Sequence, residues 1–179
     1  MSGHEERPEP AGVSELQTFL PLPNFVHSLA VLDTARLGKQ RLECGQLLAA
    51  HACLLAGRPV VGWRNHPAMR MWLGHSAALA VYQTLCHWEW TARGYNNSIL
   101  IPTYGRDGLP NPDFRHPELL APSMREATLP PWLGREDVHA SHRARLLHKA
   151  PDHYGQFGWT EQPRTDEEGY VWPVTRETR

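Results

Sequence analysis

The chain has 179 residues, which is enough for one domain that buries a core without disulfide or metal staples. Its 41% hydrophobic and 21% charged residues are typical of a globular protein, and no apolar run approaches the roughly 20 residues of a membrane-spanning helix. The net charge of -1 is unevenly distributed, because the stretch 30–95 carries seven basic and three acidic side chains while acids gather near both ends. A basic middle favours a polyanionic partner.

The cysteines and the N-terminal sequence indicate the cellular compartment in which the protein is expected. The three cysteines are odd in number and lack metal-ligand spacing, so they are interpreted as buried apolar residues in a reducing environment. The first residues, MSGHEERPEPAG, lack the basic start and apolar stretch of a secretory signal. We therefore expect a cytoplasmic protein without a membrane partner.

One long helix is expected in the N-terminal third of the chain. Residues 1–15 are polar and Pro-rich, which predicts a disordered extension, and the prolines within 16–29 favour an extended start. Asp33 or Thr34 can cap a helix that runs to about Ala56, where a glycine follows. Two glycines inside this helix each cost roughly 1 kcal/mol relative to alanine. They either permit the close approach of another group or weaken the helix.

Two further helices are expected downstream. Asn65 or His66 can cap a second helix that has proline at its first position and continues to about Arg93. Prolines break every periodic run in 96–131, so no helix is predicted there. A third helix is predicted for Glu136–Lys149, with acids at its start and bases at its end.

These elements predict a mainly α protein, since no strand pattern or internal repeat is visible. We expect a compact single domain of about three core helices over residues 16–174, with long Pro-rich loops. The aromatic, Gly-broken segment after Pro151 is expected to pack as irregular chain, and residues 175–179 form a tail.

The run RLGKQRLE in the first predicted helix is the most informative candidate site. Lys39 and Glu43 are one helical turn apart and therefore side by side on a helix face, bracketed by Arg36 and Arg41. An amine beside a carboxylate can form a Schiff base with a sugar while the carboxylate transfers a proton or stabilises positive charge. The same spacing is common in ordinary surface ion pairs. Both interpretations stay open on this evidence.

A second candidate lies at the start of the second predicted helix, in Trp63-Arg64-Asn65-His66. Free backbone N–H groups at a helix N-terminus favour an anion, and Arg64 and His66 add donors that suit a phosphate. Trp63 can stack on a base or a sugar. The alternative is a well-capped helix with a buried tryptophan.

The histidines allow a metal site as a further alternative. His139 and His142 are three residues apart on the third predicted helix, and His66 could supply another ligand. Helix capping, hydrogen bonding or phosphate contact explains the same residues without a metal. The sequence contains no phosphate loop, GxSxG elbow, Rossmann glycines or paired CxxC. We therefore expect neither a metal nor an organic cofactor.

Several segments resemble the pyrimidine-dimer DNA glycosylase family, which is also known as phage endonuclease V-like. The resemblance is strongest to a bacterial, actinobacterial-type branch and extends from Gln17 to Val174. The matching segments are QTFLPLPNF, LDTARLGKQRLE, GWRNHPAMRMW, EWTARGY, LPPWLG, HASHRARLLHKAPDHYG and YVWPV.

The resemblance implies a single α domain of three helices and a bifunctional enzyme without a metal. In the family an amine attacks the anomeric carbon of the damaged nucleotide and releases the base, and the imine then loses the 3′ phosphate by β-elimination. The acid–base residue is a glutamate on the first helix, and the spacing from Asp33 assigns this role to Glu43. Arg41 is similar to arginines that the family uses against DNA. Such enzymes also kink the duplex and displace a base, which a basic groove with aromatic side chains permits.

The resemblance leaves the nucleophilic amine open. The family uses the N-terminal α-amine of a threonine, and its counterpart here is Thr18, which follows seventeen other residues. Translation begins near Leu16, or the extension is removed, or the side-chain amine of Lys39 replaces the terminus.

The leading hypothesis is a monomeric DNA-repair glycosylase with AP-lyase activity on damaged double-stranded DNA, associated with the nucleoid. The damaged base is a pyrimidine dimer or another lesion. The alternatives are a non-catalytic nucleic-acid-binding protein, a metal-dependent hydrolase or nuclease, and a different substrate on the same fold. The catalytic candidates are Glu43, Lys39 and Thr18, and the residues expected to contact DNA are Arg36, Arg41, Trp63, Arg64, Asn65, His66, Arg70, His139, His142, Arg143 and Lys149.

Overall fold

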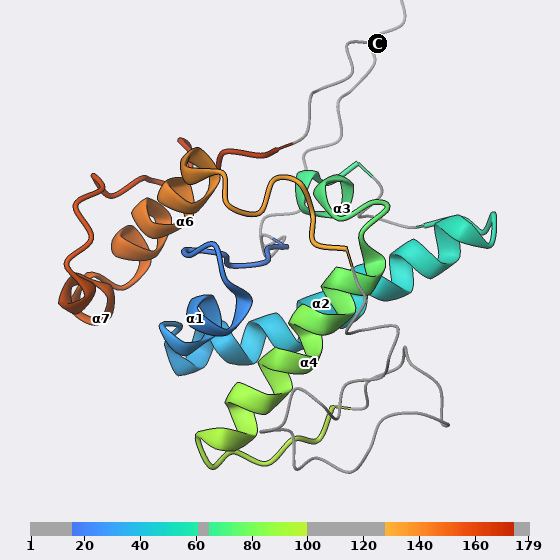
Figure 1. The fold of residues 1–179 in the computed structure, drawn as a ribbon, viewed down its shortest axis with the longest axis horizontal. Helices are drawn as coiled ribbons and strands as arrows, with labels where there is room; N and C mark the ends of the chain where they lie inside the picture. The colour runs from blue at the N-terminus through green and yellow to red at the C-terminus, as the bar shows by residue number, and fades with distance from the viewer. Residues whose placement is uncertain (1–15, 61–64, 100–127, 174–179) are drawn as a thin grey trace, which may run out of the picture.

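The computed structural model of the chain describes residues 16–60, 65–99 and 128–173. The expected N-terminal extension, Trp63, Arg64, most of the Pro-rich stretch and the C-terminal tail lie outside these ranges. The described residues form helices and no strand, so the prediction of a mainly α fold is confirmed (Figure 1). The elements are α1 (Phe25–Ala30), α2 (Thr34–Leu55), α3 (Pro67–Met71), α4 (Ser76–Ala92), α6 (Glu136–Lys149), α7 (Pro151–Tyr154) and the 3₁₀ turn η2 (Gly155–Phe157).

Helix α2 confirms the first predicted helix. Asp33 is its N-cap, because the carboxylate accepts a hydrogen bond from the Arg36 amide at 3.0 Å. The helix ends at Leu55, and Gly57 follows with a φ of 64°, a left-handed conformation that glycine adopts without strain. The cap residues and the glycine were all visible in the sequence.

The two glycines inside α2 allow close packing against α4. A Cβ atom at Gly38 would lie 3.3 Å from the Trp90 ring, and one at Gly45 would lie 2.9 Å from the amide nitrogen of Gln83. Helices α2 and α4 cross at this point and form the centre of the fold (Figure 1). Of the two explanations for these glycines, the structure therefore supports close approach.

The prediction of one continuous second helix is wrong. Helix α3 begins as expected, since the His66 ring accepts a hydrogen bond from the Ala68 amide at 3.2 Å. However, α3 ends at Met71 and α4 begins only at Ser76. Gly74 between them has a φ of 79°, which no residue inside an α-helix adopts. The apolar pattern continues into this turn through Trp72, which is buried, and Leu73, which is exposed, and for that reason the segment resembled a helix.

Helix α1 was not predicted, because the prolines within residues 16–29 favoured only an extended start and no helix was assigned there. The helix begins after both prolines, and the Asn24 side chain caps it by accepting a hydrogen bond from the His27 amide at 3.0 Å. A proline that precedes the cap restricts only the chain that leads into a helix. The segment therefore begins without a helix, as expected, and the helix from Phe25 onward is the part that was missed.

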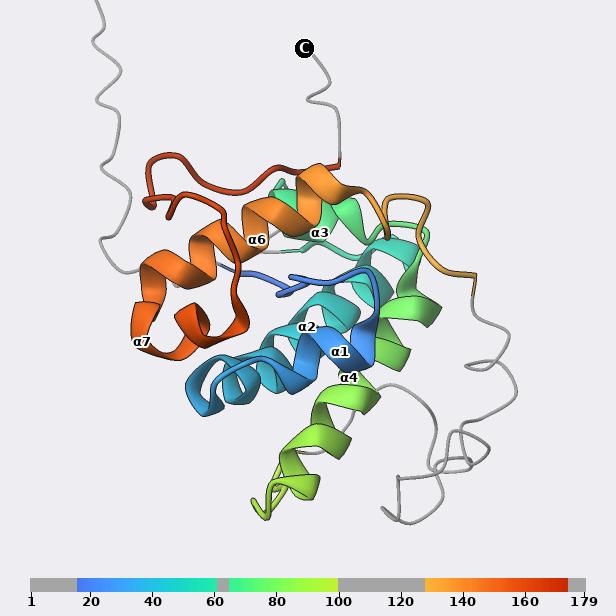
Figure 2. The ribbon, with the colours of Figure 1, turned by 60° about the vertical axis from the view of Figure 1, so that its left-hand side comes forward.

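Helix α6 confirms the third predicted helix, whereas the chain after it is more regular than expected. Pro151 occupies the first turn of α7 and so starts a short helix instead of preventing one. The following chain runs back along α6 (Figure 2). In this return segment the Arg164 amide donates to the Ala144 carbonyl at 3.1 Å, and the Val171 amide donates to the Ser141 hydroxyl at 3.0 Å.

The extended residues 16–20 lie between α2 and α6 and are bonded to both helices. The Phe19 amide donates to the Gln40 side-chain oxygen at 2.8 Å, and the Leu20 amide donates to His142 Nδ1 at 3.3 Å. The Tyr82 hydroxyl of α4 donates to the Phe19 carbonyl at 2.7 Å. Because these backbone groups are buried, such partners are required for the segment to occupy the core. This arrangement places the start of the described chain against the middle of α2.

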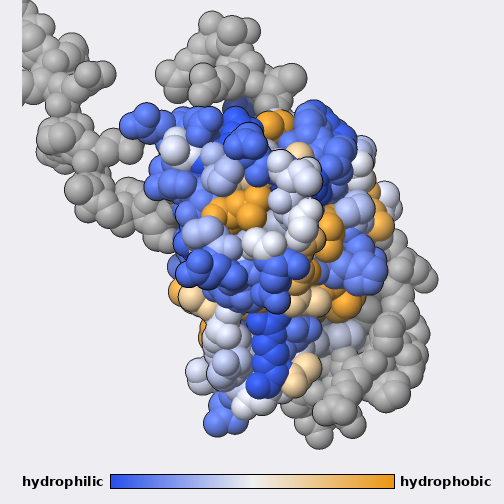
Figure 3. Space-filling model, turned by 90° about the vertical axis from the view of Figure 1, so that its left-hand side faces the viewer, coloured by the Kyte–Doolittle hydropathy of each residue, from blue (hydrophilic) through white to orange (hydrophobic). Residues whose placement is uncertain are grey.

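The face of the molecule that carries α6 and α7 is mainly hydrophilic, with small apolar patches (Figure 3). Among the described helices, none combines the length and the apolarity that crossing a bilayer requires.

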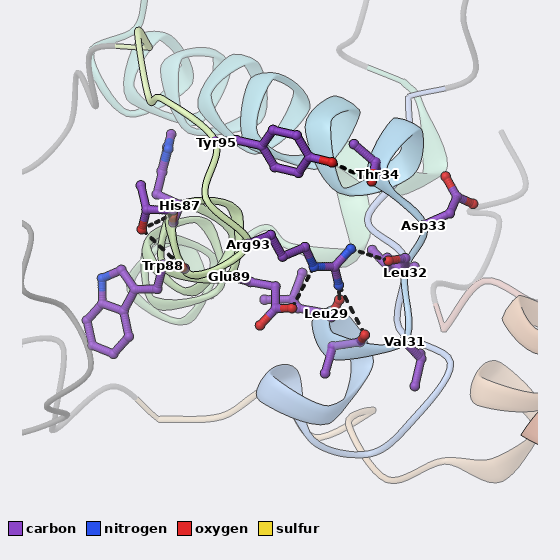
Figure 4. Close-up of polar contacts among 12 residues, drawn as sticks. Leu29, Val31, Leu32, Asp33, Thr34, His87, Trp88, Glu89, Arg93 and Tyr95 are labelled. Atoms are coloured by element: carbon purple, nitrogen blue, oxygen red, sulfur yellow. Dashed lines mark hydrogen bonds and ion pairs between the residues drawn. The ribbon is translucent and has the colours of Figure 1, made fainter.

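Arg93, just after α4, joins that helix to the end of α1 (Figure 4). Its guanidinium donates to the carbonyl oxygens of Leu29, Ala30 and Leu32 at 3.1, 3.0 and 2.7 Å, while Nε donates to Glu89 at 2.8 Å. The last carbonyls of a helix lack partners within the helix. Arg93 supplies donors to the Ala30 and Leu32 carbonyls, adds one to the Leu29 carbonyl, which the Leu32 amide also contacts, and fixes the turn that leads into α2.

We expect Arg93→Ala to lower the free energy of unfolding by about 2–3 kcal/mol, because charge-assisted hydrogen bonds are lost and carbonyl groups lose their partners. Urea denaturation at neutral pH measures the change. The exposed Arg58 is the control, and Arg58→Ala should stay within about 0.5 kcal/mol of the parent protein. Equal effects at the two positions would contradict the role given to Arg93.

Candidate functional site

The predicted pair on α2 is formed in the structure. Lys39 Nζ lies 3.3 Å from Glu43 Oε1, as the spacing of one turn requires. The two side chains differ in environment, because that of Lys39 is 35% exposed and that of Glu43 only 5%. Glu43 is therefore not a member of an ordinary surface ion pair. Its carboxylate lies under the surface with an amine at its outer edge.

The second oxygen of Glu43 receives hydrogen bonds from residues that the sequence analysis did not single out. The Gln17 backbone N–H and the Gln40 side-chain amide each donate to Glu43 Oε2 at 3.3 Å. Gln40 also donates to the Gln17 carbonyl at 2.7 Å and accepts from Phe19. Gln40 therefore holds the extended segment against the carboxylate. The available signal was a polar residue on the buried stripe of α2, one turn before Glu43.

The electrostatics of Glu43 follow from this environment. Burial raises the pKa of Glu43 from its usual 4.5 to about 7, although Lys39 and the Gln17 amide oppose the shift. Near neutral pH both the protonated and the ionised forms are therefore populated. A carboxyl group in this state can accept a proton and return it in the same reaction cycle.

Thr18, the other candidate for the catalytic amine, lies next to this site but is turned away from Glu43. Its amide donates to the Gln17 side-chain oxygen at 2.7 Å, and its hydroxyl accepts a hydrogen bond from Trp72 Nε1 at 2.9 Å. The main-chain nitrogen that contacts the carboxylate is that of Gln17. The structure thus brings Lys39, Glu43 and the Gln17 nitrogen together, with Thr18 one residue away.

The two arginines beside Lys39 in the sequence contact other protein groups. Arg36 forms an ion pair with Asp33 at 2.6 Å. The Arg41 guanidinium lies 3.8 Å from the centre of the Trp90 ring, and its NH1 donates to Asn97 at 3.0 Å. Because Arg41 and Glu43 are two residues apart on the helix, their side chains lie on opposite sides of α2.

The helix-start candidate is described only in part, since Trp63 and Arg64 lie outside the described residues. Within the described part, His66 caps α3 through its ring, which also contacts the Trp172 ring edge to face at 6.0 Å. Asn65 is exposed and Arg70 is partly exposed, so both remain accessible to a partner. Their roles as DNA contacts stay a prediction.

The candidates on α6 mainly hold the extended segment in place. His139 Nδ1 donates to the Leu20 carbonyl at 2.7 Å, and its Nε2 accepts from the Gly134 amide at 2.9 Å. Both His139 and His142 are 0% exposed, so a ligand on the present surface does not reach them. Burial lowers the pKa of His142 to about 3, with a smaller contribution from His139, which keeps this ring neutral.

The other two candidates near α6 form ion pairs. Arg143 is bonded to Glu136, to Glu161 at 2.6 Å and to the Pro21 carbonyl at 2.9 Å. Lys149 lies 3.4 Å from Asp166. Within the described ranges, no group of three histidine, cysteine or acidic side chains is arranged to hold a metal ion. The three histidines named for the metal alternative are therefore not brought together.

Comparison with known proteins identifies one family. A family model described as pyrimidine dimer DNA glycosylase matches residues 16–102, a segment that contains helices α1 to α4 and the Lys39–Glu43 pair. No curated protein and no solved structure matches the chain. The family resemblance seen in the sequence is thus confirmed, while the bacterial branch stays a prediction. Through residues 16–102, the chain is similar to the pyrimidine dimer DNA glycosylase family.

Proposed function

We propose that this protein is a DNA glycosylase with AP-lyase activity, which removes a damaged base from double-stranded DNA through a Schiff-base intermediate. The observation that carries the proposal is the buried carboxylate of Glu43, with a pKa of about 7 and an amine 3.3 Å away. A buried carboxyl group with a raised pKa beside a partly exposed amine is an arrangement suited to proton transfer at a sugar carbon. The family match supports the glycosylase part of the proposal.

The chemistry requires one amine and one acid–base group. The amine nitrogen forms a bond to C1′ of the damaged nucleotide as the glycosidic bond breaks, and the base leaves with that electron pair and a proton. Loss of the nitrogen proton and opening of the sugar ring give an imine between the amine and C1′. Removal of a C2′ proton then expels the 3′ phosphate. Glu43 is the proposed carrier of these protons, because its pKa near 7 lets it act in both directions.

Two amines are compatible with the geometry. Lys39 Nζ already lies 3.3 Å from Glu43 Oε1. The Gln17 nitrogen lies at the same distance from Oε2, but as a peptide nitrogen it is not a nucleophile. It would become one if cleavage after Leu16 exposed it as an α-amine. The Thr18 nitrogen is directed at Gln17 instead, so an α-amine there would need the segment to shift.

The proposed path of the DNA follows the exposed side of α2. Lys39 marks one edge of this side, and Ala35, Leu42, Gln46 and Ala49 are exposed along it. These neutral side chains permit close approach of a DNA strand, while basic residues elsewhere in the middle of the chain attract its phosphates. We propose that the protein binds the duplex here as a monomer, with Asn65 and Arg70 as further contacts.

Borohydride trapping tests the proposal, because borohydride reduces an imine to a stable amine. The full chain is incubated with a duplex that contains a pyrimidine dimer and, separately, with a duplex that contains an abasic site. We expect a covalent protein–DNA adduct that forms only with borohydride, is absent on undamaged duplex and is insensitive to a chelator. Base release without an adduct would remove the lyase step, and damaged DNA that is bound but unchanged would support the non-catalytic alternative.

A further inference from the structure

Trp90 and Tyr95 form an aromatic stack beside α2. Their ring centroids are 4.4 Å apart and their planes are inclined by 30°. The Tyr95 hydroxyl lies 3.3 Å from that of Thr34 at the start of α2, as Figure 4 shows. Tyr95 remains 41% exposed, which is high for a ring held by contacts on two sides. The stack therefore leaves part of Tyr95 accessible to solvent.

The local sequence builds this stack. Gly94 has a φ of 86°, and α4 ends in paired bonds from the Gly94 amide to the Thr91 carbonyl at 2.9 Å and from the Tyr95 amide to the Trp90 carbonyl at 3.3 Å. This is the Schellman arrangement, which brings the residue after the glycine against the residue one turn before the helix end. Tyr95 is thus placed on Trp90 by the backbone of the helix end. The ring is ordered before any ligand arrives.

Trp90 is also held in place by residues of α2. The Arg41 guanidinium lies 3.8 Å from the centre of the Trp90 ring, a distance at which a cation and an aromatic face attract. Gly38 leaves room for the edge of the ring, as the 3.3 Å distance to a hypothetical Cβ shows. Asn97 accepts a hydrogen bond from Arg41 at 3.0 Å and fixes the guanidinium. Arginine, tryptophan and tyrosine therefore form one rigid unit.

The stack and the Lys39–Glu43 pair lie along opposite edges of the exposed side of α2. By helical periodicity, Thr34, Gly38 and Arg41 share one side of the helix, while Lys39 and Glu43 lie on another. A helix with side chains is about 10 Å across, and successive nucleotides in one strand are about 3.4 Å apart along the duplex axis. Tyr95 contacts Thr34, which is nine residues and therefore about 13 Å along the helix axis from Glu43. A strand that presents a sugar to Glu43 therefore brings a nucleotide about five steps away within reach of Tyr95.

We infer that Tyr95, supported by Trp90 and Arg41, is a stacking surface for an unpaired base of the DNA strand bound along α2. A base has an aromatic face whatever its identity, so this contact selects unpaired over paired nucleotides and not one sequence over another. The inference rests on the proposed binding of DNA but not on the proposed chemistry. It assigns the protein an affinity for unpaired bases that does not depend on a lesion.

The test uses undamaged DNA, so its result is separate from that of the trapping experiment. One short duplex carries a single bulged 2-aminopurine, and the control duplex carries the same base paired. Binding is measured by fluorescence anisotropy, and stacking by quenching of the 2-aminopurine. We expect the parent protein to bind the bulged duplex roughly 5- to 100-fold more tightly and to quench its fluorescence.

Two substitutions separate stacking from a structural role. Tyr95→Phe keeps the ring and removes the hydroxyl contact with Thr34, whereas Tyr95→Leu keeps an apolar contact with Trp90 and removes the aromatic face. We expect Phe to retain the preference and the quenching, and Leu to lose both while urea denaturation shows it folded. Equal behaviour of the two variants would overturn the inference, and so would equal binding of both duplexes by the parent protein. Absence of quenching in the parent protein overturns it without any variant.

Discussion

Glu43→Gln is expected to abolish base release and, at alkaline pH, to make the protein more stable. The loss of activity should reach about 10²- to 10⁴-fold, the usual contribution of a positioned acid–base group. Binding of damaged duplex should persist, because glutamine keeps the size of the side chain and can still accept the hydrogen bonds from Gln17 and Gln40. Release of the base from a dimer-containing duplex and equilibrium binding of the same duplex measure the two properties.

The stability effect follows from the sign of the pKa shift. The folded-state pKa of Glu43, about 7, is above the usual 4.5, so between these values the folded protein holds a proton that the unfolded chain has lost. Stability therefore decreases as pH rises through this window, and above pH 7 the buried charge costs about 3 kcal/mol. Glutamine carries no charge, so at pH 8 we expect a gain of up to about 3 kcal/mol, and at pH 4 almost none. Urea denaturation at both pH values measures it.

Glu89→Gln is the matched control, because Glu89 also pairs with a base four residues away on a helix, Arg93 at 2.8 Å. Its side chain is 26% exposed, compared with 5% for Glu43. We expect this variant to keep its activity and to lose no more than about 1 kcal/mol. If Glu43→Gln also kept its activity, Glu43 would have no part in the mechanism. If it lost stability at pH 8, the Lys39–Glu43 pair would be structural.

The same carboxylate should determine how activity depends on pH. In its role as a proton acceptor Glu43 must be ionised, so turnover on an abasic duplex should rise with pH up to about 7. If the catalytic carboxyl group had the usual pKa of a glutamate, the protein would instead reach full activity near pH 5.

The features of α2 that could be predicted are local. The cap at Asp33, the end near Ala56 and the contact between Lys39 and Glu43 all depend on residues within a few positions of one another. Helical periodicity and capping preferences are strong enough to determine such features from the sequence. The two internal glycines are also apparent in the sequence, but the sequence does not indicate that they allow close packing against α4 in particular.

The parts of the site that were missed depend on contacts between distant segments. The Gln17 amide meets Glu43 across 26 positions of sequence, and Leu20 meets the histidines of α6 across about 120. No periodic pattern encodes such a contact, because it results from how helices pack around an extended segment. His139 and His142 illustrate the consequence, since their spacing suggested ligands whereas their position makes them partners of buried backbone.

Lys39→Arg is expected to eliminate the borohydride-trapped adduct if the lysine amine is the nucleophile. Arginine keeps a positive charge near Glu43, so the carboxylate stays in a similar field, but a guanidinium does not form the imine. Alanine would be a poorer choice, because Lys39 lowers the pKa of Glu43 and its removal would change the acid–base group as well. We expect at least a 100-fold loss of adduct, with binding of the duplex within a few-fold of the parent protein.

Only two side-chain amines have to be tested as the nucleophile, because Lys39 and Lys149 are the only lysines of the chain. Lys149 is the last residue of α6 and is paired with Asp166, so Lys149→Arg should leave the adduct unchanged. An adduct that survives both substitutions must lie on an α-amine, and mass spectrometry of the trapped peptide then identifies the first residue of the active protein. The 3.3 Å contact with Glu43 predicts Gln17 for that residue, whereas an adduct on Thr18 would mean that residues 16–20 move before reaction.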